Sequence, residues 1–178
     1  GSYGLKNLTG IQNFKLLEKL FCEKTDITNL DVSQNANLKC ICCPRTKITS
    51  LDVSNNAELE ELDCWKTGIT SLDVSKNIWL KKLSCFYTEI TSLDVNTNTK
   101  LSYLNCSYTK ITNLDVSKNT ELEELGCLET EITSLNVSSN KKLNWLNCSS
   151  TGITNLDVSQ NTNLERLYCS NTKITSLD

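Results

Sequence analysis

The sequence predicts an all-β repeat solenoid, a rod of about eight coils of 21 residues each. Two observations carry this prediction: two residue types recur at a fixed period, and the segments between them alternate apolar and polar residues as half-buried strands do. A repeat this short buries its apolar face only by stacking on its neighbours. The recurring residues are Cys22, Cys43, Cys64, Cys85, Cys106, Cys127, Cys148 and Cys169, and Ile27, Ile48, Ile69, Ile90, Ile111, Ile132, Ile153 and Ile174.

The N-terminal segment precedes the regular grid. It opens on a Gly-Ser pair that resembles a cloning remnant, and Leu5, Leu8 and Ile11 recur every third residue without joining the 21-residue period. Without a cover, the apolar edge of the first coil would face water. We therefore expect residues 1–21 to hold the remnant and an N-terminal cap with a helical turn, and residues 22–178 to form the solenoid.

Each later period divides into two similar halves. In one period the first half places Leu62 and Cys64 on one side of a short strand, and the second half does the same with Leu72 and Val74. After the cap, no stretch of 10–12 residues keeps the period of about 3.6 residues that a helix needs. We expect two parallel strand ladders on opposite sides of a flattened coil, with little or no helix.

The C-terminal end of the sequence falls at Asp178, in the middle of a repeat. A last coil without a cover leaves a sheet edge unpaired. Two explanations stay open. Either the solenoid is truncated at its C-terminus, or its uncapped coil associates end to end with a second chain.

The repeat resembles a known family. Its first half is similar to the segment L-x-x-L-x-L-x-x-N-x-L of leucine-rich repeats, with Cys64 at the last leucine and Thr67 at the asparagine, and its second half repeats the segment with Asn77. This nested pattern resembles the 21-residue class of leucine-rich repeats found in bacterial, often surface-exposed proteins, and it covers residues 17–178. The resemblance implies a bacterial extracellular or cell-surface protein that binds partners through its strand face, and the missing helical segment predicts a straighter rod.

Composition excludes several classes of function. The chain has 178 residues, a net charge of −3 and interleaved lysine and glutamate, which disfavours nucleic acid and anionic membranes as partners. It has no histidine and no apolar run long enough to insert into a membrane. A uniform rod also offers no pocket of converging unlike groups, so we predict no enzymatic activity, no cofactor and no metal.

Three polar columns recur with the coil. We expect the invariant threonines and asparagines to form hydrogen-bonded rows between coils, because both follow a strand. The aspartates should point outward, either accepting hydrogen bonds from neighbouring groups or, in the alternative, binding cations along the row. The columns are Thr25, Thr46, Thr67, Thr88, Thr109, Thr130, Thr151 and Thr172; Asn35, Asn56, Asn77, Asn98, Asn119, Asn140 and Asn161; and Asp31, Asp52, Asp73, Asp94, Asp115 and Asp157, with Asn136 in the same column.

The cysteines fall into two groups. The eight-member column occupies a buried apolar slot, so we expect free thiols that pack as small apolar residues. Cys40 and Cys42 lie where another repeat has Glu61 and Asp63, and we expect them to face outward. For this pair, we favour chance sequence variation at surface positions that tolerate substitution. The alternatives are a local disulfide, a metal site or a link to another chain.

The variable positions of the Cys-bearing strand carry the functional prediction. Nearly all aromatic residues of the grid gather there, as a protein or carbohydrate partner would require. The competing interpretation is that they only stabilise the sheet through cross-strand contacts. The candidate binding residues are Trp65, Phe86, Tyr87, Tyr103, Tyr108, Trp145 and Tyr168.

These observations favour a non-enzymatic binding module that mediates protein–protein contact or adhesion to a host or carbohydrate surface. The alternative is a structural spacer or stalk that presents another domain and has no ligand of its own.

Overall fold

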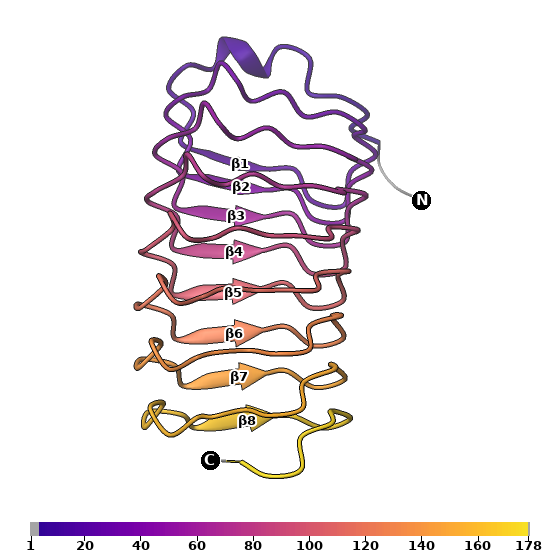
Figure 1. Cartoon of the computed structure of the whole chain (residues 1–178). Helices are drawn as coiled ribbons and strands as arrows, with labels where there is room; N and C mark the ends of the chain where they lie inside the picture. Colours follow the sequence, from indigo (N-terminus) through magenta and orange to yellow (C-terminus); the bar gives the residue numbers. More distant parts are fainter. Residues whose placement is uncertain (1–3, 178) are drawn as a thin grey trace.

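The computed structural model describes residues 4–177, so the N-terminal Gly-Ser pair and Asp178 lie outside the described residues. The chain winds into stacked coils that form one elongated rod (Figure 1). Eight parallel strands form one sheet in sequence order. The strands are β1 (Lys19–Phe21), β2 (Cys40–Cys42), β3 (Glu61–Asp63), β4 (Lys82–Ser84), β5 (Tyr103–Asn105), β6 (Glu124–Gly126), β7 (Trp145–Asn147) and β8 (Arg166–Tyr168). The predicted all-β solenoid is confirmed.

The sheet keeps one register from end to end. Leu62 pairs with Leu83, and Leu83 pairs with Leu104, so the middle residue of each strand always meets its equivalent. These three leucines are fully buried, whereas the residues on either side point away from the core. A slip of one residue would turn every leucine to solvent, so burial alone fixes this pairing.

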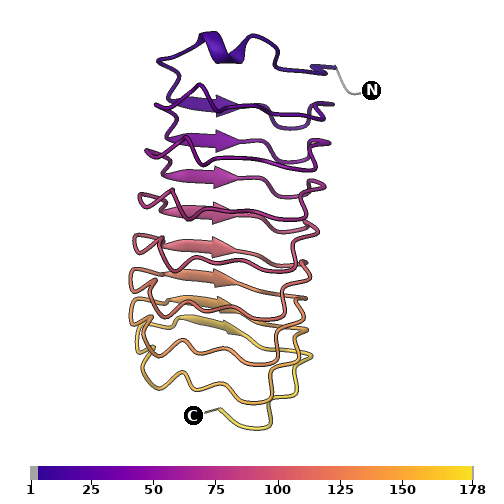
Figure 2. The ribbon, with the colours of Figure 1, turned by 45° about the horizontal axis from the view of Figure 1, so that its top comes forward.

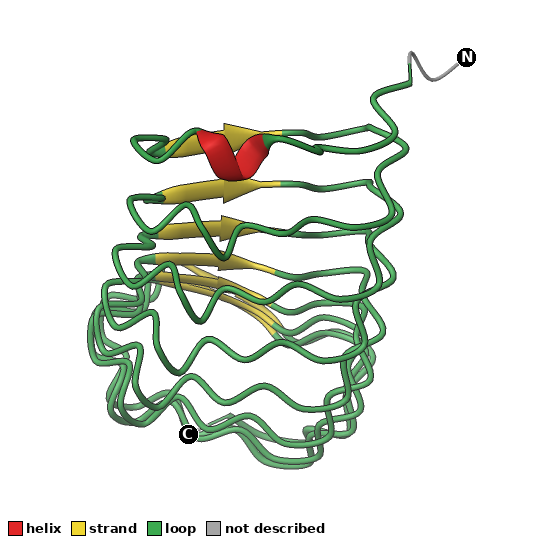
Figure 3. Cartoon of the chain, turned by 90° about the horizontal axis from the view of Figure 1, so that it is seen from above, coloured by secondary structure: helices red, strands yellow, loops and turns green. Residues whose placement is uncertain are grey.

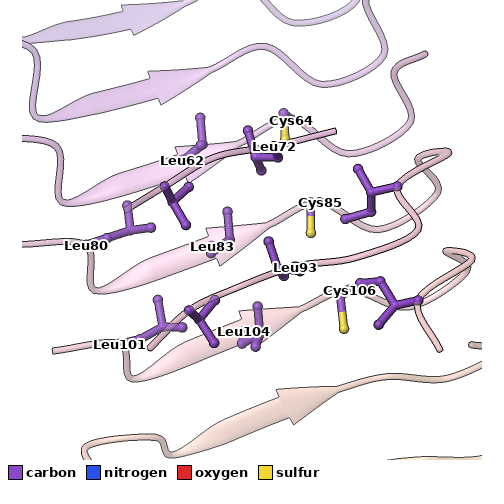
Figure 4. Close-up of a cluster of buried hydrophobic side chains, with 14 of the residues drawn as sticks. Leu62, Cys64, Leu72, Leu80, Leu83, Cys85, Leu93, Leu101, Leu104 and Cys106 are labelled. Carbon is purple, nitrogen blue, oxygen red and sulfur yellow. The ribbon is translucent and has the colours of Figure 1, made fainter. Parts of the chain in front are cut away.

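The core is a set of parallel columns inside the rod. Leu62, Cys64 and Leu72 lie above Leu83, Cys85 and Leu93, which lie above the next set (Figure 4). In the central coils the cysteines are fully buried, and all ten cysteines of the chain are free thiols. The column packs as small apolar residues, as the sequence predicts.

Each strand ends in a tight turn with a left-handed residue. Tyr87 and Tyr108 have φ of 55° and 56°, a conformation that costs a non-glycine residue of order 1–3 kcal/mol. The amide of Tyr87 donates to the carbonyl of Ser107 in the next coil at 3.0 Å, which helps hold the geometry. The threonine hydroxyl then closes the turn, with Thr88 Oγ1 2.6 Å from the carbonyl of Cys85. The threonines therefore do not form the predicted row between coils, because each is satisfied within its own turn.

The asparagines do connect the coils, through backbone groups. Asn98 is fully buried, and its Nδ2 donates to the carbonyls of Val74 at 3.0 Å and Asn77 at 2.9 Å, both in the preceding coil. The same pair of bonds recurs from Asn56 to Asn161. The row is a chain of side chain-to-backbone bonds that links each coil to the one before it.

The second predicted ladder is not formed. Within residues 4–177 the segment forms no strand: it has an isolated bridge between Leu156 and Leu177 and one backbone bond per coil at the isoleucine, such as that from the amide of Glu89 to the carbonyl of Ile69 at 3.0 Å. The polar groups that follow this segment bond locally: Asp73 Oδ1 accepts from the amide of Ser75 at 2.8 Å, and the amide of Asn77 donates to the carbonyl of Val74 at 3.0 Å. The segment is therefore extended and joined to its neighbours by one backbone bond per coil, without a continuous ladder.

The N-terminal end of the rod is covered by an irregular segment that includes the 3₁₀ turn η1 (Ile11–Asn13) (Figure 2). Leu8 and Ile11 pack against the core. Asn35, the first member of the asparagine row, donates to the carbonyls of Ile11 at 2.9 Å and Phe14 at 3.0 Å. The covering segment therefore accepts the bonds that a preceding coil would otherwise accept.

Candidate functional site

The sheet occupies one side of the coil, and the unpaired second half occupies the other (Figure 3). We call strand face the surface made by the outward side chains of β1–β8 and by the two residues that follow each strand's cysteine. Its backbone is fixed by the parallel ladder, so a variable side chain here stands on a rigid support. All seven candidate aromatic residues lie on this surface.

Four of them form what we call the aromatic cluster: Trp65, Phe86, Tyr87 and Tyr108. Trp65 and Phe86 stack with ring centroids 4.9 Å apart and planes 9° apart. Tyr87 and Tyr108 stack at 4.0 Å and 7°, and Phe86 joins the two pairs at 5.7 Å. The cluster forms because residues of equal position in consecutive coils lie one strand spacing apart, about 4.8 Å.

The other three candidates lie apart from the aromatic cluster. Trp145 on β7 meets Tyr168 on β8 at a centroid distance of 6.0 Å, in a tilted arrangement. Tyr103 stands at the start of β5, where it pairs with Lys82 on one side and Glu124 on the other. The predicted site is thus one compact cluster, one nearby tyrosine and a smaller second group.

A hollow of about 600 Å³ lies beside the aromatic cluster on the strand face. Asp63 and Ser84 are paired in its lining, Trp65 and Phe86 follow them along the chain, and Tyr103 begins the neighbouring strand. The sequence columns contain these residues but do not reveal the hollow, because its lining combines side chains from four coils. Its full lining is Glu61, Leu62, Asp63, Trp65, Lys82, Ser84, Phe86, Ser102, Tyr103, Glu123 and Glu124.

Asp63 is the most buried carboxylate of the hollow. Its burial raises the pKa of the carboxyl group, and a hydrogen bond with Ser84 opposes the shift. One of its oxygens, Oδ1, is buried and has no hydrogen-bond partner within the described residues. A partner that brought a hydrogen-bond donor to this carboxylate would offset the free-energy cost of burying its charge and that of its missing hydrogen bond.

Cys40 and Cys42 flank the buried Ile41 on the outward side of β2, but they are not exposed as the sequence predicts. Cys40 is buried, with 7% of its surface exposed, and Cys42 is half-buried. Their register neighbours include Lys19, Glu61 and Asp63, whose longer side chains cover the shorter thiols. Burial, then the charges of Asp63 and Glu23, raise the pKa of Cys42 to about 12.

These thiols are expected to resist alkylation in the folded protein. With a pKa of about 12, only about one part in 10⁴ of Cys42 is thiolate at pH 8. Peptide mapping by mass spectrometry after brief iodoacetamide treatment should find Cys169, which is half-buried in the last coil, labelled before Cys42. Denatured protein, in which every cysteine should react, is the control. Fast labelling of Cys42, or a Cys40–Cys42 disulfide, would contradict the expectation.

The described residues contain no group of three or more cysteine, aspartate or glutamate side chains placed to hold a metal ion. The aspartate row is accounted for by hydrogen bonds: Asp73, Asp115 and Asp157 each accept from the amide of the serine two residues later. Asn136 makes the same bond with Ser138 at 3.0 Å, so this position needs an acceptor and not a charge. Within residues 4–177, no helix has the length and apolar character to cross a membrane.

Solved structures of other proteins share the fold of this chain. No protein-family model matches the chain, and a search of curated proteins finds no significant match. Among solved structures, the chain is 37% identical to the functional domain of InlJ from Listeria monocytogenes, with a TM-score of 0.80. The match covers 99% of this chain and 44% of that one, so the chain spans less than half of its relative. The InlJ domain includes a cysteine ladder.

Two further structures share the fold at lower identity. A leucine-rich repeat protein of Leptospira interrogans is 22% identical, with a TM-score of 0.90, over 97% of this chain and 48% of that chain. The leucine-rich repeat ectodomain of the Arabidopsis thaliana receptor kinase GASSHO1/SCHENGEN3, solved in complex with CASPARIAN STRIP INTEGRITY FACTOR 2, is 18% identical, with a TM-score of 0.88. That match covers 96% of this chain and 23% of the receptor chain. The sequence-based assignment to bacterial leucine-rich repeats is confirmed.

Proposed function

We propose that this chain, a leucine-rich repeat solenoid of the bacterial 21-residue class, is a non-enzymatic binding module of the cell surface that holds a protein partner on its strand face. One observation carries the proposal: the aromatic cluster gathers four large side chains from three consecutive coils on a rigid support. Aromatic side chains at the centre of a rigid patch dominate the energy of protein–protein contacts. Leucine-rich repeat structures of this fold also hold protein partners in solved complexes.

The stacking favours a protein over a carbohydrate. Sugar rings bind most favourably to the open face of an aromatic ring, but Trp65 and Phe86 turn one face each to the other. The guanidinium of Arg45 lies 5.9 Å from the centroid of the Trp65 ring, which occupies that ring further. Tyr87 and Tyr108 cover each other in the same way. Each stacked ring has at most one face left for a sugar, and Tyr87, with 48% of its surface exposed, also offers a hydroxyl group, which suits the mixed apolar and hydrogen-bonding surface of a protein.

The alternative function is a spacer, in which the aromatic cluster only stabilises the sheet. Each stacked pair contributes about 0.5–1.5 kcal/mol beyond its buried area, which is a sufficient structural role. What supports binding over the spacer is the distribution of these residues. A purely structural role would be served by aromatic residues in any coils, whereas four of them gather in three consecutive coils and only Phe21, Trp145 and Tyr168 lie in other strands of the described strand face.

The proposal is tested with the double variant Trp65→Ser, Phe86→Ser. The wild-type chain, immobilised, is used to recover binding proteins from bacterial-surface and host-cell extracts, and each candidate is then measured as a purified protein. We expect the double variant to weaken binding at least tenfold, the loss expected when a central aromatic anchor is removed. Thermal unfolding of each variant checks that the coil remains folded.

A matched control is the double variant Ile78→Ser, Trp79→Ser. These residues are exposed, at 52% and 44%, and lie outside the strand face, so the control removes a similar exposed apolar surface. It should leave binding unchanged. If the control and the test variant bind equally well, the aromatic cluster is not the contact surface and the proposal fails; if the wild-type chain recovers no partner, the spacer is the better description. If a glycan array yields the only ligands, a protein partner is the wrong class.

A further inference from the structure

The hollow beside the aromatic cluster combines two kinds of wall. Aromatic rings from Trp65, Phe86 and Tyr103 line part of it, and carboxylates from Glu61 and Glu124 stand at the starts of β3 and β6. An apolar wall next to an acidic one is unsuited to a plain hydrophobic anchor. It suits a side chain that is flat, partly apolar and positively charged.

The net charge of the side chains that line the hollow is negative. Four carboxylates line it, from Glu61, Asp63, Glu123 and Glu124, against the single ammonium of Lys82. With every group ionised, four negative charges and one positive charge leave a net charge of −3 in the hollow. A basic partner segment would therefore be steered toward it, and an acidic segment would be repelled.

The chain already places cations on its own tryptophans. The guanidinium of Arg45 lies 5.9 Å from the centroid of Trp65, and the ammonium of Lys100 lies 4.8 Å from that of Trp79. Such contacts arise because the face of an aromatic ring attracts positive charge. A cation that enters the hollow meets Tyr103, which stacks on no other aromatic ring within the described residues, together with the carboxylates of Glu61 and Glu124.

We propose that this hollow receives an arginine side chain of the protein partner. The inference rests on the proposed function, since it names the chemistry of one contact on the same strand face. Arginine fits better than lysine because its planar guanidinium can lie against an aromatic ring while its fork of N–H groups bonds to a carboxylate. The partner segment is therefore basic and carries at least one arginine.

The test uses fluorescence anisotropy with labelled hexa-arginine, hexalysine and hexaglutamate peptides at low ionic strength. Hexa-arginine should bind most tightly, and hexaglutamate should not bind. The double variant Glu61→Gln, Glu124→Gln should weaken hexa-arginine binding about five- to tenfold. Hexalysine binding as tightly as hexa-arginine would overturn the assignment to arginine.

A charge-matched control separates the hollow from the general negative charge of the chain. The double variant Asp73→Asn, Asp115→Asn removes two carboxylates from the second half of the coil, away from the strand face (Figure 3). Asn136 already fills this column with the same hydrogen bond, so the control should fold normally. Its affinity for hexa-arginine should stay within about twofold of wild type. Equal losses in both double variants would show that only net charge matters, and the proposal would fail.

The inference and the proposed function can fail separately. If a purified partner depends on Trp65 and Phe86 but is insensitive to Glu61→Gln, Glu124→Gln, the aromatic cluster binds and the arginine contact is refuted. Suppose instead that hexa-arginine binds through the carboxylates but no protein depends on the aromatic cluster. The preference of the hollow for arginine then stands, and the proposed protein-binding function is refuted.

Discussion

Replacing Asn98 with alanine is expected to lower the free energy of unfolding by about 1–3 kcal/mol, because the change removes two buried hydrogen bonds between coils. The Nδ2 of Asn98 donates to the carbonyls of Val74 and Asn77, and the whole side chain is buried. Each lost bond costs about 0.5–1.5 kcal/mol, since each carbonyl keeps one backbone donor: the amide of Asn77 for Val74 and the amide of Leu80 for Asn77. Part of this cost is offset, since Asn98 Oδ1 has no partner within the described residues and is lost with the side chain.

The measurement is unfolding by guanidinium chloride, followed by circular dichroism, with Asn105→Ala as the control. Asn105 is half-buried on β5, and its Oδ1 accepts from the amide of Ser107 at 3.1 Å, in its own coil. Its loss should cost about 1 kcal/mol or less. If Asn98→Ala were as mild as this control, the asparagine row would not link the coils energetically.

Much of the fold could be predicted because the period is strict. The invariant cysteine and isoleucine columns fix where each coil repeats, and the alternation around Leu62 fixes which face of the strand is buried. The second ladder was predicted from the similar alternation around Leu72, and there the prediction is wrong. Alternation reports which side chains point inward, but not whether neighbouring backbones pair. The local bond of Asp73 does not decide that question, because Asn105 makes the same bond at the end of β5, which does pair.

The candidate site could be predicted in its residues and only partly in its geometry. Trp65 and Phe86 share a column one coil apart, so their stacking follows from the repeat. The hollow does not follow, because its lining also includes Tyr103 and Glu124 from other coils, whose side-chain conformations the repeat does not specify. The burial of Cys40 was missed for a related reason: an outward position is exposed only if its neighbours are short.

The second large effect is expected from Leu104→Ala, which should lower the free energy of unfolding by about 2–5 kcal/mol. Leu104 is fully buried at the middle of β5, where it pairs with Leu83 and Leu125 in the coils on either side. The change opens a void between columns that are stacked on both sides. Because the sheet register is fixed by these leucines, the coils cannot slide to close the void.

The same substitution in the last coil should cost much less, which makes Leu167→Ala the matched control. Leu167 is at the middle of β8 but is only half-buried, since β8 has a neighbouring strand on one side alone. In a stack where each coil touches only its neighbours, a defect at the end loosens one coil, whereas a defect in the middle breaks the stack in two. Leu104→Ala should therefore shift the main unfolding transition, and Leu167→Ala should mainly increase amide hydrogen exchange in the last coil. Equal shifts from both variants would mean that the rod unfolds as one unit, with no dependence on position.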